Sequence, residues 1–532
     1  MPLLTLDAAV LERFGKDYFP AVSESLRFFG PEIQVTCAIL AIFLADAFIP
    51  RRFSRHMAWP ALAACLAAAI SVVPLFWTEP RALFLGMTAI DPLANFFKMF
   101  LLLGTVPVIL LSYLSGSLRE TRMGEYYGIL LAAVLGGMLM ASANHLIMAF
   151  LALELLSISS YILVGYLKTD PKGAEASLKY IIYGSVAAGI MIYGLSLLYG
   201  LTGSGDFRDL GRLLEGVQAG AGNLGVLKIT VTLAILLSFA GLAFKMAAIP
   251  MHFWCPDVYE GAPTAITAFL SVVSKAAGFA LALRFLHALK IVDVDLARAV
   301  NWPIILAVLS MFTMTLGNMA ALGQDNLKRM LAYSSIAHAG YMMMGLVVVH
   351  GQYPGMGLVA YYLLAYLAMN LGAFAIVILV EERLGSVDIG CYTGLGRRSP
   401  FLAAAMTLFL FSLIGIPPTA GFTGKLQLFQ GILAEARTVG WPYYLLTVVA
   451  IVNTAVSVYY YARVIGKMYL VGAGSAPAAV ASPGGAGTGD LERIRFPVLG
   501  TALVALLLFL TFYLFFRLEA VSKITLKLTI FS

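Results

Sequence analysis

Long hydrophobic runs recur along the whole chain, and the short segments between them carry most of the charged residues. An α-helix needs about 20 apolar residues to cross the hydrocarbon core of a bilayer, and these runs are of that length. The pattern therefore predicts an all-α polytopic membrane protein with about fourteen transmembrane helices. In chain order, the predicted spans are 31–50, 58–77, 92–114, 124–142, 145–167, 175–200, 229–250, 262–288, 302–322, 327–349, 355–380, 400–434, 442–469 and 497–516.

Two interruptions of the hydrophobic pattern lie five spans apart. Pro250 and Pro256 interrupt span 7, and the sequence GIPPTAGFTGK at 415–425 interrupts span 12. In transporters, broken helices occur in inverted repeats, and an odd number of spans per repeat reverses the second copy. We therefore predict two inverted five-helix repeats, spans 4–8 and 9–13, each with one broken helix. The predicted units are spans 1–3 with the N-terminal segment at 1–123, a first repeat at 124–288, a second repeat at 302–469, a flexible Gly/Ala-rich linker at 470–496, and the last span with a C-terminal tail at 497–532.

The composition of the 532 residues excludes most soluble classes of protein. Charged residues make up 12% of the chain and hydrophobic residues 61%, whereas a soluble domain carries about 25% charged residues. So few charges cannot cover that much apolar surface in water, which excludes a soluble enzyme, a disordered protein and a nucleic-acid-binding protein. The net charge of +7 is typical of a membrane protein with Lys and Arg in its cytoplasmic loops. We expect the lipid bilayer, and no nucleic acid, as a partner.

The distribution of Lys and Arg between the loops predicts the orientation in the membrane. Loops after odd-numbered spans hold 16 of these residues, and the internal loops after even-numbered spans hold 7. Positively charged loops are retained in the cytoplasm. We therefore expect the odd loops to be cytoplasmic and both termini to be periplasmic, in the inner (cytoplasmic) membrane of a bacterium.

The cysteine and histidine patterns indicate no cofactor site. The four cysteines are far apart and form no CxxC pair, and the six histidines lack the spacing of metal ligands. The glycines of the linker resemble a phosphate-binding loop only superficially, because no strand precedes them. We expect neither a metal nor a cofactor in this chain.

A few charged residues fall within or at the margins of the predicted spans, where a charge at the helix centre costs on the order of 3 kcal/mol. Lys98 and Arg284 lie near predicted span ends, and we expect them to reach an interface or to hold helices together. For Lys179, a structural and a functional role fit the sequence equally well. A functional role is favoured for the others, which have no nearby interface: Glu154, Lys245, Lys275 and Lys425.

The helix interruptions give two of these lysines a possible route to water. Lys245 precedes the break in span 7, and Lys425 follows the break in span 12. Broken helices at membrane depth expose backbone polar groups, which are tolerated only inside protein or beside a water-filled cavity. A desolvated lysine amine can release a proton, and a nearby carboxylate such as that of Glu154 favours its charged form. These residues are therefore candidates for loading and releasing protons.

His338 could connect such lysines. It lies in the sequence YSSIAHAGY, with Ser334, Ser335 and Tyr341 about one turn away on the predicted helix. Imidazole can accept and donate a proton near neutral pH. A packing role for a lone histidine on a helix is equally compatible with the sequence.

Several motifs resemble a known family of membrane proteins. The segment 244–284, FKMAAIPMHFWCPDVYEGAPTAITAFLSVVSKAAGFALALR, is similar to the signature region of the N subunits of proton-pumping NADH:quinone oxidoreductase, respiratory complex I. The sequences EASLKYIIYGS, DNLKRMLAYSSIAHAGYMMMG and GIPPTAGFTGK also match that family. The resemblance covers spans 4–13 and fades in the first 110 residues and around the linker.

This resemblance implies fourteen transmembrane helices, inverted repeats, and a place in the membrane arm beside an antiporter-like M-type subunit and small membrane subunits. It implies an antiporter-like subunit of a translocase, which couples quinone reduction elsewhere in the complex to proton transport and has no redox chemistry of its own. NADH, FMN, iron–sulfur clusters and the quinone would be bound by other subunits.

The resemblance also implies a role for each matched residue. Glu154 would be the carboxylate that modulates Lys245 in the broken seventh helix. Lys275 would be the central proton carrier, and Lys425 the carrier at the broken twelfth helix. In the related M subunits that last position is usually Glu, so Lys425 favours the N type.

Two further matched residues, Lys179 and His338, would belong to the same proton pathway, on the sixth and tenth helices. Two other functions stay open at this point. A free-standing or multisubunit cation/proton antiporter would need an acidic cation site, for which one deep carboxylate is a poor basis. A mainly structural membrane-arm subunit would use its buried charges to hold helices together.

Overall fold

The computed structural model describes residues 18–118, 121–211, 224–289, 301–351, 355–470, 494 and 496–530. Twelve helices in this part of the chain are long and apolar enough to cross a membrane. The all-α polytopic fold is confirmed, and the count of fourteen spans stays a prediction. Most of the predicted linker at 470–496 lies outside the described residues.

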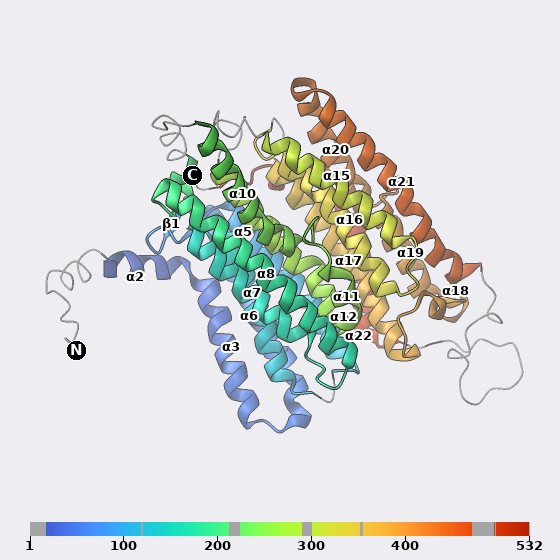
Figure 1. Ribbon diagram of the computed structural model, residues 1–532. Coiled ribbons are helices and arrows are strands. Elements are labelled where there is room, and N and C mark those ends of the chain that lie inside the picture. The colour runs from blue at the N-terminus through green and yellow to red at the C-terminus, as the bar shows by residue number, and fades with distance from the viewer. Residues whose placement is uncertain are drawn as a thin grey trace, which may run out of the picture.

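The N-terminal part contains two elements that the hydrophobic pattern does not predict. Helix α2 (Phe19–Phe28) runs across the direction of α3 (Gly30–Phe48) at one side of the bundle (Figure 1). A small antiparallel hairpin pairs β1 (Arg81–Leu83) with β2 (Thr88–Ile90). The other elements of this part are η2 (Arg51–Met57), α4 (Ala58–Val72), η3 (Val73–Trp77) and α5 (Pro92–Leu114).

The helices of the predicted first repeat lie on one side of the bundle and those of the second repeat on the other (Figure 1). The first group contains α6 (Met123–Ser142), α7 (Leu146–Val164), α8 (Pro171–Thr202), α10 (Leu224–Met246), α11 (Trp254–Gly261), α12 (Thr264–Phe269), the π-turn η4 (Leu270–Ser274) and α13 (Lys275–Ala288). The second group contains α15 (Trp302–Ala321), α16 (Leu327–Val347), α17 (Gly355–Leu384), η5 (Ile389–Tyr392), α18 (Leu395–Arg398), α19 (Pro400–Ile414), α20 (Ala420–Val439) and α21 (Trp441–Tyr469). The chain continues in α22 (Val498–Phe516) and α23 (Leu518–Thr525).

Both predicted helix breaks are confirmed. Helix α10 ends at Met246 and the chain becomes helical again at Trp254, while α19 ends at Ile414 and α20 begins at Ala420. The second break begins at Gly415, whose φ of +93° lies in the left-handed region that glycine adopts without a steric penalty.

Span 8 is less regular than the sequence predicts. Its helix is interrupted by the π-turn Leu270–Ser274, directly before Lys275. Ser271 accepts a hydrogen bond from Asn370 Nδ2 on α17 (2.8 Å) and donates one to Ala268 O (2.8 Å). Such turns are frequent at functional sites. The π-turn therefore supports a functional role for Lys275, the first residue of α13.

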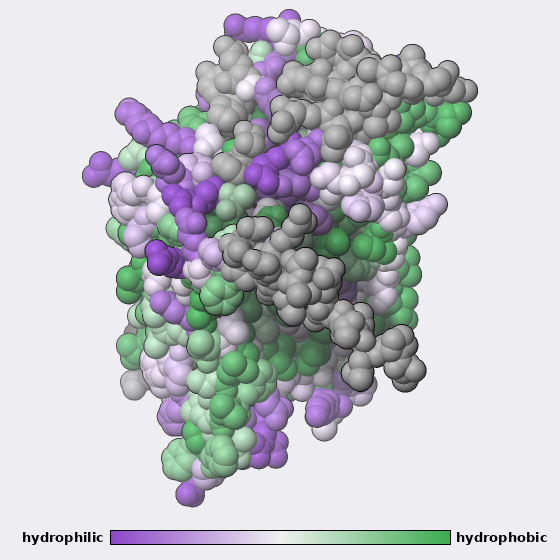
Figure 2. Space-filling model, turned by 90° about the vertical axis from the view of Figure 1, so that its left-hand side faces the viewer, coloured by the Kyte–Doolittle hydropathy of each residue, from purple (hydrophilic) through white to green (hydrophobic). Residues whose placement is uncertain are grey.

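The centre of the bundle is formed by α17 and by the segment from α12 to α13, whose side chains are almost all buried. Helices α8 and α21 instead expose large apolar side chains such as Ile182 and Val448. On the face shown in Figure 2, hydrophobic residues cover a broad middle and lower region, and hydrophilic residues gather above and below it. This distribution fits a protein surrounded by lipid or by other membrane subunits.

Candidate functional site

Lys245 lies at the broken end of α10. Its side chain is only 1% exposed, and its amine donates a hydrogen bond to Ser157 Oγ on α7 (3.3 Å). The amine also lies 6.0 Å from the centre of the Tyr180 ring on α8. At the end of α10, the carbonyl groups of Ala243 and Phe244 accept hydrogen bonds from Ala248 and Ala247. The buried amine of Lys245 is therefore held by a neutral hydroxyl group on a neighbouring helix.

Glu154 lies on α7, one turn before the serine that Lys245 contacts. Its side chain is half-buried, so it does not lie as deep in the bundle as its position in the span suggests. Its Oε1 atom is buried and has no hydrogen-bond partner in the described part of the chain. Among the described residues, Glu154 and Lys245 are neighbours without a direct ion pair.

Lys275 is the first residue of α13 and is completely buried. Its amine donates hydrogen bonds to the carbonyl oxygen of Ser335 (2.9 Å) and to the hydroxyl oxygen of the same residue (2.6 Å). The helix of Lys275 also packs on the end of α10, because a Cβ added at Gly278 would lie 3.3 Å from the Cβ of Lys245. The two lysines therefore belong to one packed region.

Helix α16 carries three polar groups in consecutive turns: Ser335, His338 and Tyr341. His338 Nδ1 forms a hydrogen bond with the Tyr362 hydroxyl on α17 (2.7 Å). The predicted neighbour Ser334 points elsewhere and forms a hydrogen bond with Tyr461. Of the two predicted serines, only Ser335 therefore contacts one of the buried lysines.

Lys425 lies on α20, close to the second helix break. Its amine donates to Ile414 O (2.9 Å), one of the carbonyl groups left without a helical partner at the end of α19. It also donates to Thr454 Oγ1 on α21 (3.5 Å) and lies 4.4 Å from the centre of the Tyr341 ring. The Tyr341 hydroxyl itself contacts Thr454 Oγ1 at 3.1 Å.

Together these residues form a buried polar line across the interface between the two groups of helices. It runs from Lys275 through Ser335, His338 and Tyr341 to Lys425, whose side chains are all at most 4% exposed. Hydroxyl and imidazole groups can both donate and accept hydrogen bonds. In the described residues, a hydrogen bond joins Lys275 to Ser335, whereas His338 contacts Tyr341, and Tyr341 contacts Lys425, through their rings. Within the described residues, no group of three or more His, Cys, Asp and Glu side chains could hold a metal ion.

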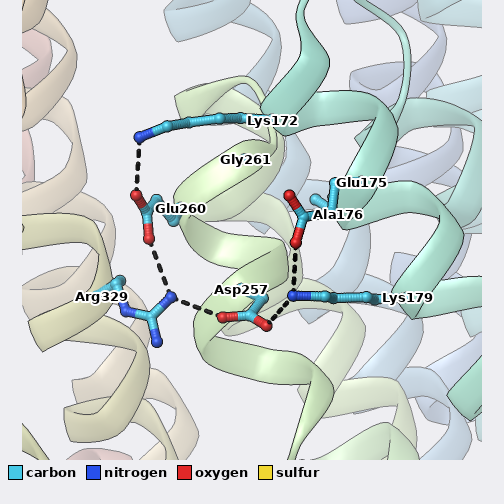
Figure 3. A pocket seen from close by; sticks show the side chains of 8 residues that line it. All are labelled: Lys172, Glu175, Ala176, Lys179, Asp257, Glu260, Gly261 and Arg329. Carbon is cyan, nitrogen blue, oxygen red and sulfur yellow. Dashed lines mark hydrogen bonds and ion pairs between the residues drawn. The ribbon is translucent and has the colours of Figure 1, made fainter.

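Lys179 is not part of this line. Its side chain is 38% exposed and forms ion pairs with Glu175 (2.7 Å) and with Asp257 on α11 (2.7 Å). Figure 3 shows that it belongs to a cluster of charged side chains from α8, α11 and the start of α16. Of the six residues that the sequence selects, the structure brings His338 and the three buried lysines into the interior, with Glu154 beside them.

Lys98 and Arg284 are both more buried than their predicted positions near span ends suggest. Lys98 pairs with Glu32 on α3 (2.6 Å), and Arg284 pairs with Asp91 at the start of α5 (2.6 Å). All four side chains are at most 1% exposed. Of the two expected roles, the structure therefore favours holding helices together. Each residue forms an ion pair inside the bundle with a carboxylate from another part of the chain, and neither reaches an interface.

Sequence reasoning named Ser335 but missed the other polar partners of the buried lysines and of His338. Ser157, Tyr362 and Thr454 make these contacts, and their only signal is a polar residue within an apolar helix. Lys328 was also missed, because it lies at the predicted start of a span. Its side chain is 4% exposed, and its amine donates to Ala262 O (2.7 Å).

Residues 143–453, more than half of the chain, match the family described as "NADH:quinone oxidoreductase/Mrp antiporter, TM". NADH-quinone oxidoreductase subunit N from Anaeromyxobacter sp. (strain Fw109-5) is 45% identical over 469 residues, which cover 86% of this chain and 90% of the relative. NADH-quinone oxidoreductase subunit N 2 from Chloroherpeton thalassium is 44% identical over 451 residues, covering 83% and 85%.

Two solved structures are similar over nearly the whole chain. A chain of respiratory complex I from Thermus thermophilus is 32% identical, with a TM-score of 0.71 and coverage of 93% of this chain and 98% of that one. A chain of the Mrp complex from Dietzia sp. DQ12-45-1b has a TM-score of 0.76 and covers 94% and 96%, but its 21% identity shows only a shared fold. The chain therefore belongs to the NADH:quinone oxidoreductase/Mrp antiporter family, among the relatives that are N subunits of NADH-quinone oxidoreductase.

Proposed function

We propose that this chain is a proton-translocating membrane-arm subunit of an NADH:quinone oxidoreductase and carries out no redox chemistry itself. The observation that supports this function most strongly is the buried polar line from Lys275 to Lys425. Three lysines of the site are fully buried, and none of them forms a direct ion pair with a carboxylate in the described residues. Burial without a carboxylate partner makes the charged form of a lysine amine unfavourable. Such an amine can therefore release a proton and bind one again.

The proposed roles follow the positions of these groups. Lys245 receives a proton beside Glu154, whose carboxylate favours the charged form of the amine. Lys275 carries the proton to the centre of the chain. Ser335, His338 and Tyr341 then connect it with Lys425, which releases it at the second helix break. Lys179 lies at the exposed edge and contributes to proton uptake.

The partners and cofactors follow from the relatives. The names of those relatives are subunit names, so this chain would assemble with other membrane-arm subunits, including an antiporter-like M-type subunit and small membrane subunits. NADH, FMN, iron–sulfur clusters and the quinone would be bound elsewhere in the complex. The loop charges support a bacterial inner membrane location with both termini in the periplasm.

The two broken helices also support the proposed inverted repeats. The first unit, 124–288, contains the break between α10 and α11, and the second unit, 302–469, contains the break between α19 and α20. Each unit carries a buried lysine close to its break. Spans 1–3 would form a separate N-terminal unit at 1–123, and the segments 470–496 and 497–532 would be the linker and the last span.

Replacing Lys275 by Ala in the assembled complex tests the function directly. We expect quinone-linked proton pumping in vesicles to be lost while assembly is retained. Lys275→Arg should also fail, because a guanidinium group does not release a proton near neutral pH. Pumping at the wild-type rate in Lys275→Ala would contradict the proposed role. Sodium-driven transport by the chain alone in liposomes would instead favour a free-standing cation/proton antiporter.

A further inference from the structure

A charged cavity of about 120 Å³ lies where α8, α11 and the start of α16 meet (Figure 3). Six of its lining side chains form one chain of ion pairs with N–O distances between 2.6 and 3.0 Å: Lys172, Glu260, Arg329, Asp257, Lys179 and Glu175. A water molecule occupies roughly 30 Å³ in the liquid, so several could fit in such a polar space. By the predicted orientation, this cavity faces the cytoplasm.

A stacked pair of aromatic rings, part of a larger cluster of buried rings, lies next to one of these ion pairs. Tyr180 follows Lys179 on α8, and Trp254 lies one turn before Asp257 on α11. The two rings are stacked, with centroids 4.5 Å apart and planes at 22°. Both side chains are at most 1% exposed. The Tyr180 ring also contacts the rings of Tyr161 and Phe244, and its centre lies 6.0 Å from the amine of Lys245. The stack therefore connects the exposed ion pair with the buried lysine.

The polar groups of the two rings differ in their hydrogen bonding beside Lys245. Trp254 Nε1 donates a hydrogen bond to Phe244 O (3.1 Å), the carbonyl directly before Lys245. The Tyr180 hydroxyl is buried without a hydrogen-bond partner in the described residues. A buried hydroxyl without a partner is unfavourable, and water entering the stack would supply one.

We infer that the Tyr180–Trp254 stack is a closed barrier between the charged cavity and Lys245, and that the Lys179–Asp257 ion pair keeps it closed by joining α8 to α11. The inference rests on the proposed function, because it makes water in the cavity the proton source for Lys245. When the Lys179–Asp257 pair opens, α11 moves away from α8 beside Trp254 while the Lys172–Glu260 pair still joins the same two helices, and water reaches Lys245 past Trp254. Lys179 and Asp257 are thus positioning residues for proton uptake.

Passive proton leak tests the barrier without any turnover. In proteoliposomes that contain the assembled complex, Trp254→Ala should increase the rate of ΔpH decay several-fold, whereas Trp254→Phe should leave it near the wild-type rate. Trp302→Ala is a matched control, since it also removes a fully buried tryptophan but lies on α15. Leak in Trp254→Ala no greater than in Trp302→Ala would overturn the inference. Adding Lys245→Ala to Trp254→Ala should abolish the extra leak.

Labelling of the native Cys255 provides a second test if Trp254→Ala does not assemble. This thiol is completely buried and follows Trp254 in the chain. In inside-out vesicles, a charged, membrane-impermeant methanethiosulfonate should modify Cys255 several-fold faster in Asp257→Asn than in wild type, measured on the Cys255 peptide by mass spectrometry. Asp257→Glu should restore slow labelling.

Glu175→Gln is the matched control for this labelling experiment. It removes the outer partner of Lys179 but leaves the ion pair with Asp257, so Cys255 should stay protected. Equal labelling rates in Asp257→Asn, Glu175→Gln and wild type would overturn the inference. The proposed function fails separately, if Lys275→Ala or Lys245→Ala pumps at the wild-type rate, because leak and labelling do not depend on pumping.

Discussion

Lys275 donates hydrogen bonds to both the carbonyl and the hydroxyl oxygen of Ser335, at 2.9 and 2.6 Å. The amine is thus held by two neutral oxygen atoms from the neighbouring helix and not by a carboxylate. Loss of its proton would leave no unpaired negative charge beside it. This contact gives the lysine a fixed position in both charge states and links it to the helix that carries His338.

Ser335→Ala should reduce quinone-linked proton pumping several-fold, because it removes the hydroxyl that joins Lys275 to the polar line on α16. Pumping should be measured in inverted membrane vesicles, normalised to the amount of assembled complex. Ser334→Ala is the matched control, since this neighbouring serine contacts Tyr461 and lies off the line. Equal losses in both variants would contradict the specific role of Ser335.

Tyr362→Phe should also lower the pumping rate, because it removes the hydroxyl that forms a 2.7 Å hydrogen bond with His338 Nδ1. The ring stays in place, so packing changes little. Tyr361→Phe serves as the control: its hydroxyl is also buried, but it contacts Thr423 and Leu514 O. If only the Tyr361 variant were impaired, the proposed path through His338 would be wrong.

Lys98→Met should destabilise the chain by about 3–5 kcal/mol, because it leaves the Glu32 carboxylate buried without its charge partner. The effect should appear as a lower midpoint of thermal unfolding of the assembled complex. The double variant Lys98→Met/Glu32→Leu should recover much of the loss, since apolar side chains can replace a buried pair. Lys523→Ala, which breaks an exposed ion pair with Glu519, should have no measurable effect. A double variant less stable than Lys98→Met would contradict this account.

Gly421→Ala should impair both assembly and pumping, because an added Cβ would lie 1.7 Å from Ser412 O on the other side of the helix break. Either α19 or α20 must move, and Lys425 lies one turn further along α20. Gly189→Ala on α8 is the control, since its Cβ would meet no atom within 4 Å. Wild-type pumping in a Gly421→Ala complex would show that the position of α20 at the break is not critical.

The sequence by itself determined the membrane class, most of the helices and the breaks in spans 7 and 12. Hydrophobic length and proline placement are local properties, so they can be read along the chain. The same reasoning selected Lys245, Lys275 and Lys425, because a lysine far from a span end has no nearby interface. The π-turn before Lys275 and the small hairpin before α5 have no comparably strong local signal.

Only the tertiary structure decided which charges share a neighbourhood. Lys179 and Lys98 both lie near the ends of hydrophobic runs, yet Lys179 is exposed beside Asp257, and Lys98 is buried against Glu32. The spacing of residues along a helix determines how far along the helix a side chain lies and on which face. The groups that pack against that face come from segments distant in the chain. The link from Lys275 to Ser335 spans 60 positions for the same reason. Burial and pairing of a charge are properties of helix packing, and packing brings these partners together.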